Sequence, residues 1–198
     1  MPTLLCDVGG VLIENPWVKM SEEIGRKLGV DPGEVLRLLM GLSRRLDSGE
    51  LALRQFHHAL VAALGADYPF PQLEERLDAA LKKNRAVWDS VQELGRTEGW
   101  QVVALSNMSR EVWGSLQRKF GIGALFASVV LSFEHGVLKP DPAIYALALK
   151  QAKARADECI FVDDVEENVE AAASLGITPY LARRPRETAD FIRSLGTR

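Results

Sequence analysis

Several polar residues stand directly after short apolar runs, where a strand of a parallel sheet would end. They comprise three carboxylates, one hydroxyl and one amide: Asp7, Ser106, Asn107, Asp163 and Asp164. Lys139 adds an ammonium group just before Asp141-Pro142, a pair typical of a helix start. In an open α/β sheet, ligands bind beyond the carboxyl ends of the strands. We therefore expect these side chains to converge on one site.

This set of side chains predicts phosphoryl-transfer chemistry. Three neighbouring carboxylates repel one another, so such a site requires compensating cations. Lys139 would supply one cation, and Mg²⁺, which prefers carboxylate and carbonyl oxygens, would supply the other. Beside a serine hydroxyl, these groups can hold a phosphoryl group and stabilise its charge. Asp7 would then be free to attack phosphorus and form an aspartyl-phosphate.

The elements that must position these residues have the pattern of a doubly wound α/β fold. Short runs that are apolar on both faces are typical of buried parallel strands, and the last of them is weakened by Pro179. The runs are Thr3–Cys6, Val102–Leu105, Ser128–Leu131, Cys159–Val162 and Thr178–Ala182. Helical spacing recurs between the later runs, at Val112–Phe120, Ala143–Lys150 and Glu166–Leu175. The alternation predicts a Rossmann-like parallel sheet covered by helices.

The stretch from about residue 15 to residue 84 interrupts this alternation. It contains no convincing strand, and its leucines form stripes with helical spacing. We expect these stripes to pack against one another in a small bundle, although a partner-binding face is an alternative. The sequence therefore predicts a core domain of residues 1–14 and 85–198, with an α-helical cap of residues 15–84 inserted after the first strand.

The order of the polar motifs resembles that of the haloacid dehalogenase (HAD) superfamily of hydrolases. The matching motifs are Asp7-Val8-Gly9-Gly10-Val11-Leu12, Ser106-Asn107, Lys139-Pro140 and Asp163-Asp164. Each motif alone is weak, but the full set in this order and at this spacing is specific. The resemblance covers nearly the whole chain, including the inserted cap. Within the superfamily, the chain is similar to small bacterial sugar-phosphate phosphatases and to the N-terminal phosphatase domain of soluble epoxide hydrolase.

The resemblance implies a role for each matching residue. Asp7 is expected to be the nucleophile, and Ser106 to donate a hydrogen bond to the phosphoryl group. Lys139 is expected to steady both the nucleophile and the phosphate charge. Asn107 is expected to shape the phosphate pocket through its backbone N–H. The catalytic residues are thus Asp7, Ser106 and Lys139, and the substrate-binding residues are Ser106, Asn107 and Lys139.

The metal ligands implied by the resemblance are Asp7, the Gly9 carbonyl, Asp164 and, in or next to the coordination shell, Asp163. Position 9 is also where the chain departs from the family pattern. Most phosphatases of the family carry an aspartate there, which acts as general acid and then as base. Gly9 cannot donate a proton, and such help is typically worth about a hundredfold to ten-thousandfold. A substrate hydroxyl, a cap residue or water could replace it.

The resulting prediction is a Mg²⁺-dependent phosphomonoester hydrolase that acts on a small phosphorylated metabolite through an aspartyl-phosphate. One alternative is a metal-independent 2-haloacid dehalogenase, a branch that usually has an aromatic residue at position 9 and lacks the Asp163-Asp164 pair. Another is a weakly active module that binds phosphate or metal, for which Gly9 is the only support.

Several candidate residues also have simpler interpretations. Asp7 could start a turn, Ser106 could cap the next helix, and Lys139 could be a solvated surface lysine. Asp163-Asp164 could begin a helix, where the helix dipole favours acids. In the predicted cap, Arg44 and Arg45 stand before Asp47-Ser48-Gly49, in a helix end that could overhang the pocket, but a surface role is favoured. His57 and His58 are expected to divide between packing and solvent.

Composition limits the classes of partner. The chain has 198 residues, 47% of them hydrophobic, and a formal net charge of −3, which gives no broad positive field for nucleic acid or anionic lipid. A membrane span needs roughly 20 consecutive apolar residues, and none is present. No signal peptide is visible. We therefore expect a cytoplasmic monomer or homodimer whose partner is a small-molecule phosphate ester, with Cys6 and Cys159 as free core thiols.

Overall fold

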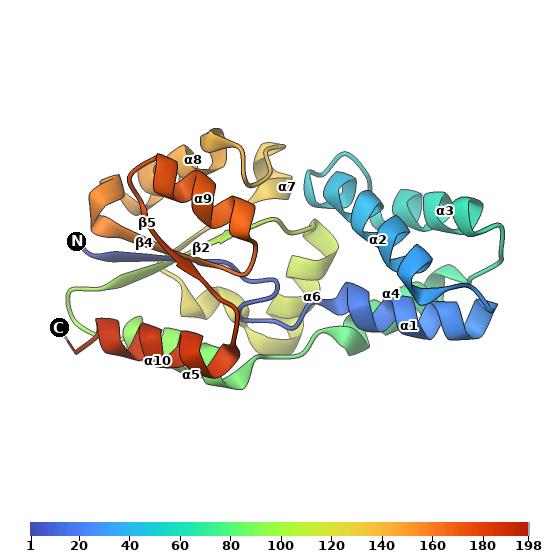
Figure 1. Ribbon diagram of the computed structural model, residues 1–198, viewed down its shortest axis with the longest axis horizontal. Coiled ribbons are helices and arrows are strands. Elements are labelled where there is room, and N and C mark those ends of the chain that lie inside the picture. The colour runs from blue at the N-terminus through green and yellow to red at the C-terminus, as the bar shows by residue number, and fades with distance from the viewer. Residues whose placement is uncertain (198) are drawn as a thin grey trace.

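The computed structural model describes residues 1–197 and contains a five-stranded parallel sheet with helices on both faces (Figure 1). The strands are β1 (Thr3–Cys6), β2 (Gln101–Ser106), β3 (Ser128–Leu131), β4 (Cys159–Asp163) and β5 (Thr178–Leu181), in the order β3-β2-β1-β4-β5. All the pairings are parallel. The predicted α/β fold class and its strands are confirmed.

Strand β1 lies at the centre of the sheet because all of its side chains can be buried. Leu4 and Cys6 join the core on one face, and Leu5 joins the core on the other, as the alternation of a strand requires. Strand β5 pairs only with β4, so Pro179 lies in an edge strand, where a missing backbone donor is tolerated. Cys6 and Cys159 are buried free thiols, as predicted.

Two layers of helices cover the sheet, α8 and α9 on one face and α5 and α10 on the other (Figure 1). Helices of the core are α5 (Arg85–Leu94), α6 (Arg110–Phe120), α7 (Ser132–His135), α8 (Pro142–Ala152), α9 (Glu166–Ser174) and α10 (Pro185–Leu195), with short 3₁₀ turns at Ile122–Leu125 and Ala156–Glu158. Helix α8 begins at the predicted Asp141-Pro142 start, where the Asp141 carboxylate accepts a hydrogen bond from the Ala143 N–H.

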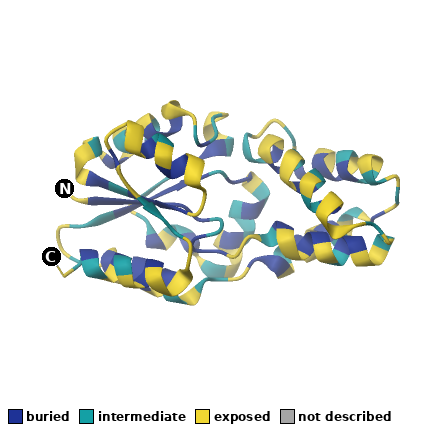
Figure 2. Cartoon of the chain, viewed as in Figure 1, coloured by how far each residue is buried: buried dark blue, intermediate teal, exposed yellow. Residues whose placement is uncertain are grey.

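Residues between β1 and α5 form helices α1 (Pro16–Leu28), α2 (Pro32–Asp47), α3 (Leu53–Leu64) and α4 (Phe70–Ala80), which we call the inserted helices. They lie together beyond one end of the sheet, with their buried residues on the sides that face one another (Figure 2). The predicted stripes are buried there, among them Leu39, Phe56, Leu60 and Leu73. The exact division into a core and a cap, at residues 14/15 and 84/85, stays a prediction.

Both ends of the described chain lie at the amino ends of the strands. The Met1 amino group pairs with Glu158, which directly precedes β4, at 3.0 Å. Gly196 lies beside Thr97, just before β2. The inserted helices lie at the opposite end of the molecule (Figure 1). Within residues 1–197, no helix combines the length and the apolar character that crossing a membrane demands.

Candidate active site

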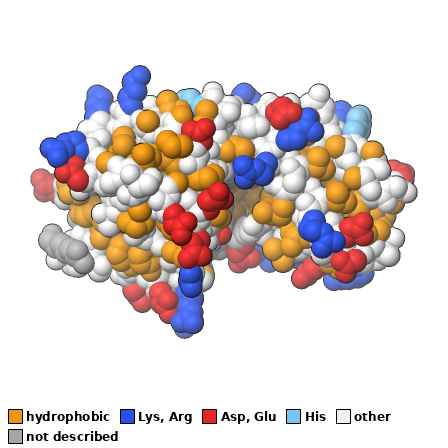
Figure 3. Space-filling view, turned by 45° about the horizontal axis from the view of Figure 1, so that its top comes forward, with side chains coloured by type: hydrophobic (Ala, Val, Ile, Leu, Met, Phe, Trp, Pro, Cys, Tyr) orange, Lys and Arg blue, Asp and Glu red, His pale blue; other side chains and the backbone are white. Residues whose placement is uncertain are grey.

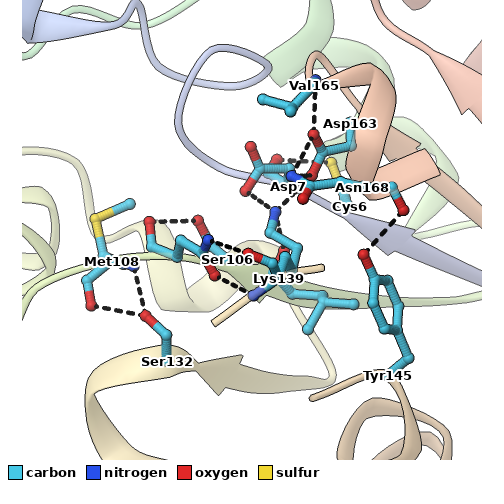
Figure 4. Close-up of polar contacts among 12 residues, drawn as sticks. Cys6, Asp7, Ser106, Met108, Ser132, Lys139, Tyr145, Asp163, Val165 and Asn168 are labelled. Carbon is cyan, nitrogen blue, oxygen red and sulfur yellow. Dashed lines mark hydrogen bonds and ion pairs between the residues drawn. The ribbon is translucent and has the colours of Figure 1, made fainter. Parts of the chain in front are cut away.

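Lys139 is the centre of a buried group of charges at the carboxyl ends of β1 and β4 (Figure 4). Its Nζ lies 2.8 Å from Asp7 Oδ1 and 2.5 Å from Asp163 Oδ2, and it donates to the Leu105 carbonyl at 3.0 Å. The three side chains of Asp7, Lys139 and Asp163 are between 0% and 7% exposed. The predicted convergence of these residues is confirmed, and the interpretation of Lys139 as a surface lysine is wrong.

The charge on Lys139 is maintained by its two carboxylate partners. Burial by itself disfavours an ammonium, but Asp7 and Asp163 outweigh it and raise the pKa of Lys139. The same burial raises the pKa of Asp7 to about 7, because the attraction of Lys139 is offset by the nearby charges of Asp163 and Asp164. Lys139 alone therefore does not fully stabilise the negative charge of Asp7, and a further cation nearby would favour its ionised form.

Asp163 and Asp164 are neighbours in sequence but have different surroundings. Both oxygens of the buried Asp163 are engaged, since they accept hydrogen bonds from the Val165 N–H at 2.8 Å and from Asn168 Nδ2 at 3.0 and 3.1 Å, in addition to Lys139. Asp164 is exposed and lines the cavity described below. Although the residue as a whole is exposed, desolvation of its carboxyl at the cavity and the charge of Asp163 raise the pKa of Asp164.

A hard divalent cation fits this donor set. Carboxylate oxygens of Asp7, Asp163 and Asp164 lie within 4.8 Å of one another, and Lys139 brings one positive charge to these three carboxylates. Oxygen-only ligands are those that Mg²⁺ prefers. The cluster can therefore hold a metal ion.

Gly10 provides the space that Asp164 occupies. Its φ is +83°, a conformation that favours glycine, and a Cβ on this residue would lie 2.0 Å from Asp164 Oδ2. We expect Gly10→Ala to displace the Asp164 carboxylate and to lower affinity for Mg²⁺ at least tenfold, measured by calorimetric titration. Gly41→Ala is the matched control, since this glycine is on α2 and a Cβ there meets nothing within 4 Å. Equal Mg²⁺ affinity in the two variants would contradict this expectation.

The residue that follows β2 is hydrogen-bonded to the loop that carries Lys139. Asn107 exchanges two hydrogen bonds with the Lys139 backbone, accepting from its N–H at 2.8 Å and donating to its carbonyl at 3.1 Å. Ser106 is fully buried, and its hydroxyl makes one long contact, 3.5 Å, to the Asn107 carbonyl. Ser109, rather than Ser106, caps α6 by accepting from the Val112 N–H, so the capping interpretation of Ser106 is wrong.

A cavity of about 270 Å³ lies between this cluster and the inserted helices. Asp7, Gly9, Asn107, Lys139 and Asp164 line it from the sheet side. Much of the remaining lining is apolar and comes from α1, α2, α6 and adjoining loops: Trp17, Met40, Leu81, Met108, Val112 and Leu116. Figure 3 shows the surface hollowed between the two parts of the molecule, with acidic side chains gathered beside the hollow.

Sequence reasoning did not select Asp47, the last residue of α2, which lines this cavity with Arg44. Burial, and next the negative charge of Asp7, raise the pKa of the Asp47 carboxyl to about 7, against the opposing charges of Lys139 and Arg44. Its backbone carbonyl accepts a hydrogen bond from Ser132 Oγ at 2.5 Å. The only signal in the sequence was the position of Asp47 in a helix end expected to overhang the pocket.

The other candidates from the inserted helices lie apart from the charged cluster. Arg45 is exposed and pairs with Glu50 at 2.6 Å, whereas Arg44 is exposed but also lines the cavity. His57 is buried against the edge of Phe70, and His58 is exposed, which confirms the predicted division between packing and solvent.

The family follows from comparison of the sequence with known families. The model of the family described as haloacid dehalogenase-like hydrolase matches residues 2–176. The chain belongs to this family. It is thus a HAD-like hydrolase, as the motif order predicted.

One curated relative is similar to this HAD-like hydrolase over most of its length. Phosphatase MT3486 of Mycobacterium tuberculosis is 26% identical over 212 residues, which cover 94% of this chain and 89% of the relative. Two longer relatives match only in part. Acyl-CoA dehydrogenase family member 10 of Mus musculus is 40% identical over 104 residues, and bifunctional epoxide hydrolase 2 of Rattus norvegicus is 34% identical over 70. The matches cover 50% and 35% of this chain but only 9% and 12% of those proteins.

A solved structure of a HAD family enzyme from Bacteroides thetaiotaomicron shares the fold of this HAD-like hydrolase. It is 25% identical with a TM-score of 0.74, and the superposition covers 91% of this chain and 93% of that enzyme. That enzyme was crystallised with magnesium and inorganic phosphate.

Proposed function

We propose that this HAD-like hydrolase is a Mg²⁺-dependent phosphomonoester hydrolase that forms an aspartyl-phosphate on Asp7. The observation that carries the proposal is the ion pair between Lys139 and Asp7, 2.8 Å, within a cluster of three carboxylates whose charge one lysine does not balance. At such a site, a metal ion would neutralise the carboxylates, and the metal ion and Lys139 together would attract a dianionic phosphate. A relative named as a phosphatase, similar over 94% of this chain, supports the same reaction.

In this mechanism the Asp7 carboxylate attacks phosphorus, and the bond from phosphorus to the leaving oxygen breaks. Lys139 favours the ionised form of Asp7, orients it and neutralises charge on the phosphoryl oxygens. Ser106 and the backbone of Asn107 donate hydrogen bonds to those oxygens. Water then attacks the aspartyl-phosphate and releases inorganic phosphate. The inserted helices limit the access of bulk water to the ester.

We propose Asp7, Asp164 and the Gly9 carbonyl as the residues that would hold Mg²⁺. Asp163 is also part of the carboxylate cluster, but its existing hydrogen bonds suit a place next to the coordination shell, where it orients Lys139. When bound, Mg²⁺ supplies positive charge that stabilises the phosphoryl oxygens in the transition state.

The cavity indicates the size and polarity of the substrate. Its volume, about 270 Å³, suits a small molecule, and its apolar lining favours a phosphate ester of a compact, partly apolar alcohol. A cytoplasmic location and a monomeric or dimeric state remain predictions.

The testing experiment is hydrolysis of p-nitrophenyl phosphate by the purified chain, with Mg²⁺ and then with EDTA. We expect turnover that depends on Mg²⁺ and falls at least about a hundredfold in EDTA, because the carboxylate cluster repels a phosphate dianion without the metal. Turnover of 2-chloropropionate that is unaffected by EDTA, without phosphatase activity, would contradict the proposal and favour the dehalogenase alternative. Binding of phosphate without any turnover would favour the binding module.

A further inference from the structure

The proposed reaction needs a proton donor that Gly9 cannot provide. When the ester of an ordinary alcohol is cleaved, the leaving oxygen carries negative charge unless an acid protonates it in the transition state. The donor must reach this oxygen from the side opposite the nucleophile, because attacking and leaving oxygens stand roughly in line through phosphorus. Asp7 is on the sheet side of the cavity, so the leaving oxygen faces the inserted helices.

The carboxyl groups that line the cavity are few: Asp7, Glu14, Asp47, Asp164 and Glu167. Asp7 and Asp164 belong to the carboxylate cluster beside Lys139. Glu14 and Glu167 are exposed, and neither is on an inserted helix, since Glu14 precedes α1 and Glu167 is on α9. Asp47 is half-buried and is the cavity-lining carboxyl that an inserted helix contributes.

The position of Asp47 is fixed against the core. Ser132 Oγ accepts a hydrogen bond from the Met108 N–H at 2.9 Å and donates to the Asp47 carbonyl at 2.5 Å, so one hydroxyl joins the end of β3 to the end of α2. Gly49 lies so close to α7 that a Cβ would come within 3.0 Å of the Phe133 carbonyl. The last turn of α2 is therefore held beside the cavity rather than free to move away from it.

The Asp47 carboxyl is also available for chemistry. Neither of its oxygens makes a hydrogen bond or an ion pair within residues 1–197, although Arg44 is on the same helix and Lys139 and Asp7 face it from the core. The ionisable residues of the adjoining α7, Glu134 and His135, are exposed. Since its pKa is raised to about 7, a substantial fraction of Asp47 is protonated at neutral pH.

We propose that Asp47 is the general acid and base of this HAD-like hydrolase, supplied by an inserted helix in place of position 9. The inference rests on the proposed phosphatase function. As the bond between Asp7 and phosphorus forms, the bond to the alcohol oxygen breaks, and that oxygen takes the proton of the Asp47 carboxyl. The Asp47 carboxylate then takes a proton from the water that attacks the aspartyl-phosphate. Asp7 leaves as a carboxylate, and Asp47 is protonated again.

The test compares two esters of similar size and polarity, p-nitrophenyl phosphate and benzyl phosphate. The nitrophenolate is a stable anion that leaves without a proton, whereas the benzyl alcohol oxygen requires one. We expect Asp47→Asn to lower kcat/KM for benzyl phosphate about a hundredfold to ten-thousandfold, and for p-nitrophenyl phosphate less than about tenfold. Glu14→Gln, which makes the same change from acid to amide in the same cavity, is the matched control and should leave the ratio of the rates on the two esters as in the wild type.

A second substitution distinguishes the loss of a proton donor from a general loss of structure in Asp47→Asn. Position 9 has room for a side chain, because a Cβ there meets nothing within 4 Å, and Gly9 faces the same cavity. The double variant Gly9→Asp/Asp47→Asn should therefore have a kcat/KM for benzyl phosphate at least about tenfold higher than that of Asp47→Asn alone.

Equal losses on both esters in Asp47→Asn, or no rescue by Gly9→Asp while both proteins melt as the wild type does, would overturn the assignment of Asp47. A wild-type chain that hydrolyses neither ester would instead refute the proposed function and with it this inference.

Discussion

Asp7→Asn is expected to reduce Mg²⁺-dependent hydrolysis of p-nitrophenyl phosphate by at least about ten-thousandfold, because an amide oxygen cannot form the covalent intermediate. The fold should survive. Asparagine has the same shape, and its carbonyl oxygen can still accept from Lys139, which lies 2.8 Å from Asp7 Oδ1. Retained turnover in Asp7→Asn would contradict the assigned nucleophile.

The stability of the same variant should depend on pH in a defined direction. The pKa of Asp7 is about 7 in the folded chain, above the ordinary value of 3.8, so the folded state binds more protons than the unfolded state between these values. The wild type therefore loses stability as pH rises through this window, and the neutral asparagine does not. Without metal, the Tm of Asp7→Asn relative to wild type should rise between pH 4 and pH 8. A difference that stays constant would contradict this reasoning.

Lys139→Met is expected to have the largest effect on stability. It leaves Asp7 and Asp163 buried and facing each other, and it removes the donor to the Leu105 carbonyl. Removing one partner of a buried ion pair typically costs about 3–5 kcal/mol of the free energy of unfolding. In a chain of this length, that corresponds to a fall in Tm of roughly 10 °C or more.

The control for this prediction is Lys150→Met, which changes an exposed lysine on α8. Asp163→Asn added to Lys139→Met should recover part of the lost stability, since it removes one of the two unpaired carboxylates. If thermal denaturation shows that Lys139→Met and Lys150→Met melt alike, the buried ion pairs do not stabilise the fold.

The fold was predictable because its strands are buried on both faces and are marked by short apolar runs. Two strands extend one residue past the carboxyl ends of their apolar runs: Ser106 pairs with Leu131, and Asp163 pairs with Leu181, so both are the last residues of their strands. A polar residue can end a buried strand when partners satisfy it, and the four hydrogen-bonding contacts of Asp163 do so.

The different surroundings of Asp163 and Asp164 follow from the end of β4, since Asp163 is the last residue of the strand and Asp164 is in the loop that follows it. The position of Asp47 was not predictable. It is 40 residues from Asp7 in sequence, and its approach to the cavity depends on how the inserted helices pack onto the core through Ser132 and Phe133. Helical periodicity shows which face of α2 is buried, but not what its last turn faces.

The placement of the chain ends has a consequence for how this enzyme can be joined to other proteins. Met1 and Gly196 lie at the amino ends of the strands, with the whole depth of the sheet between them and the carboxylate cluster. A neighbouring domain, an affinity tag or a surface anchor attached at either end therefore leaves the mouth of the cavity unobstructed. The architecture suits incorporation into multidomain polypeptides, and either terminus is a suitable point for immobilising the protein.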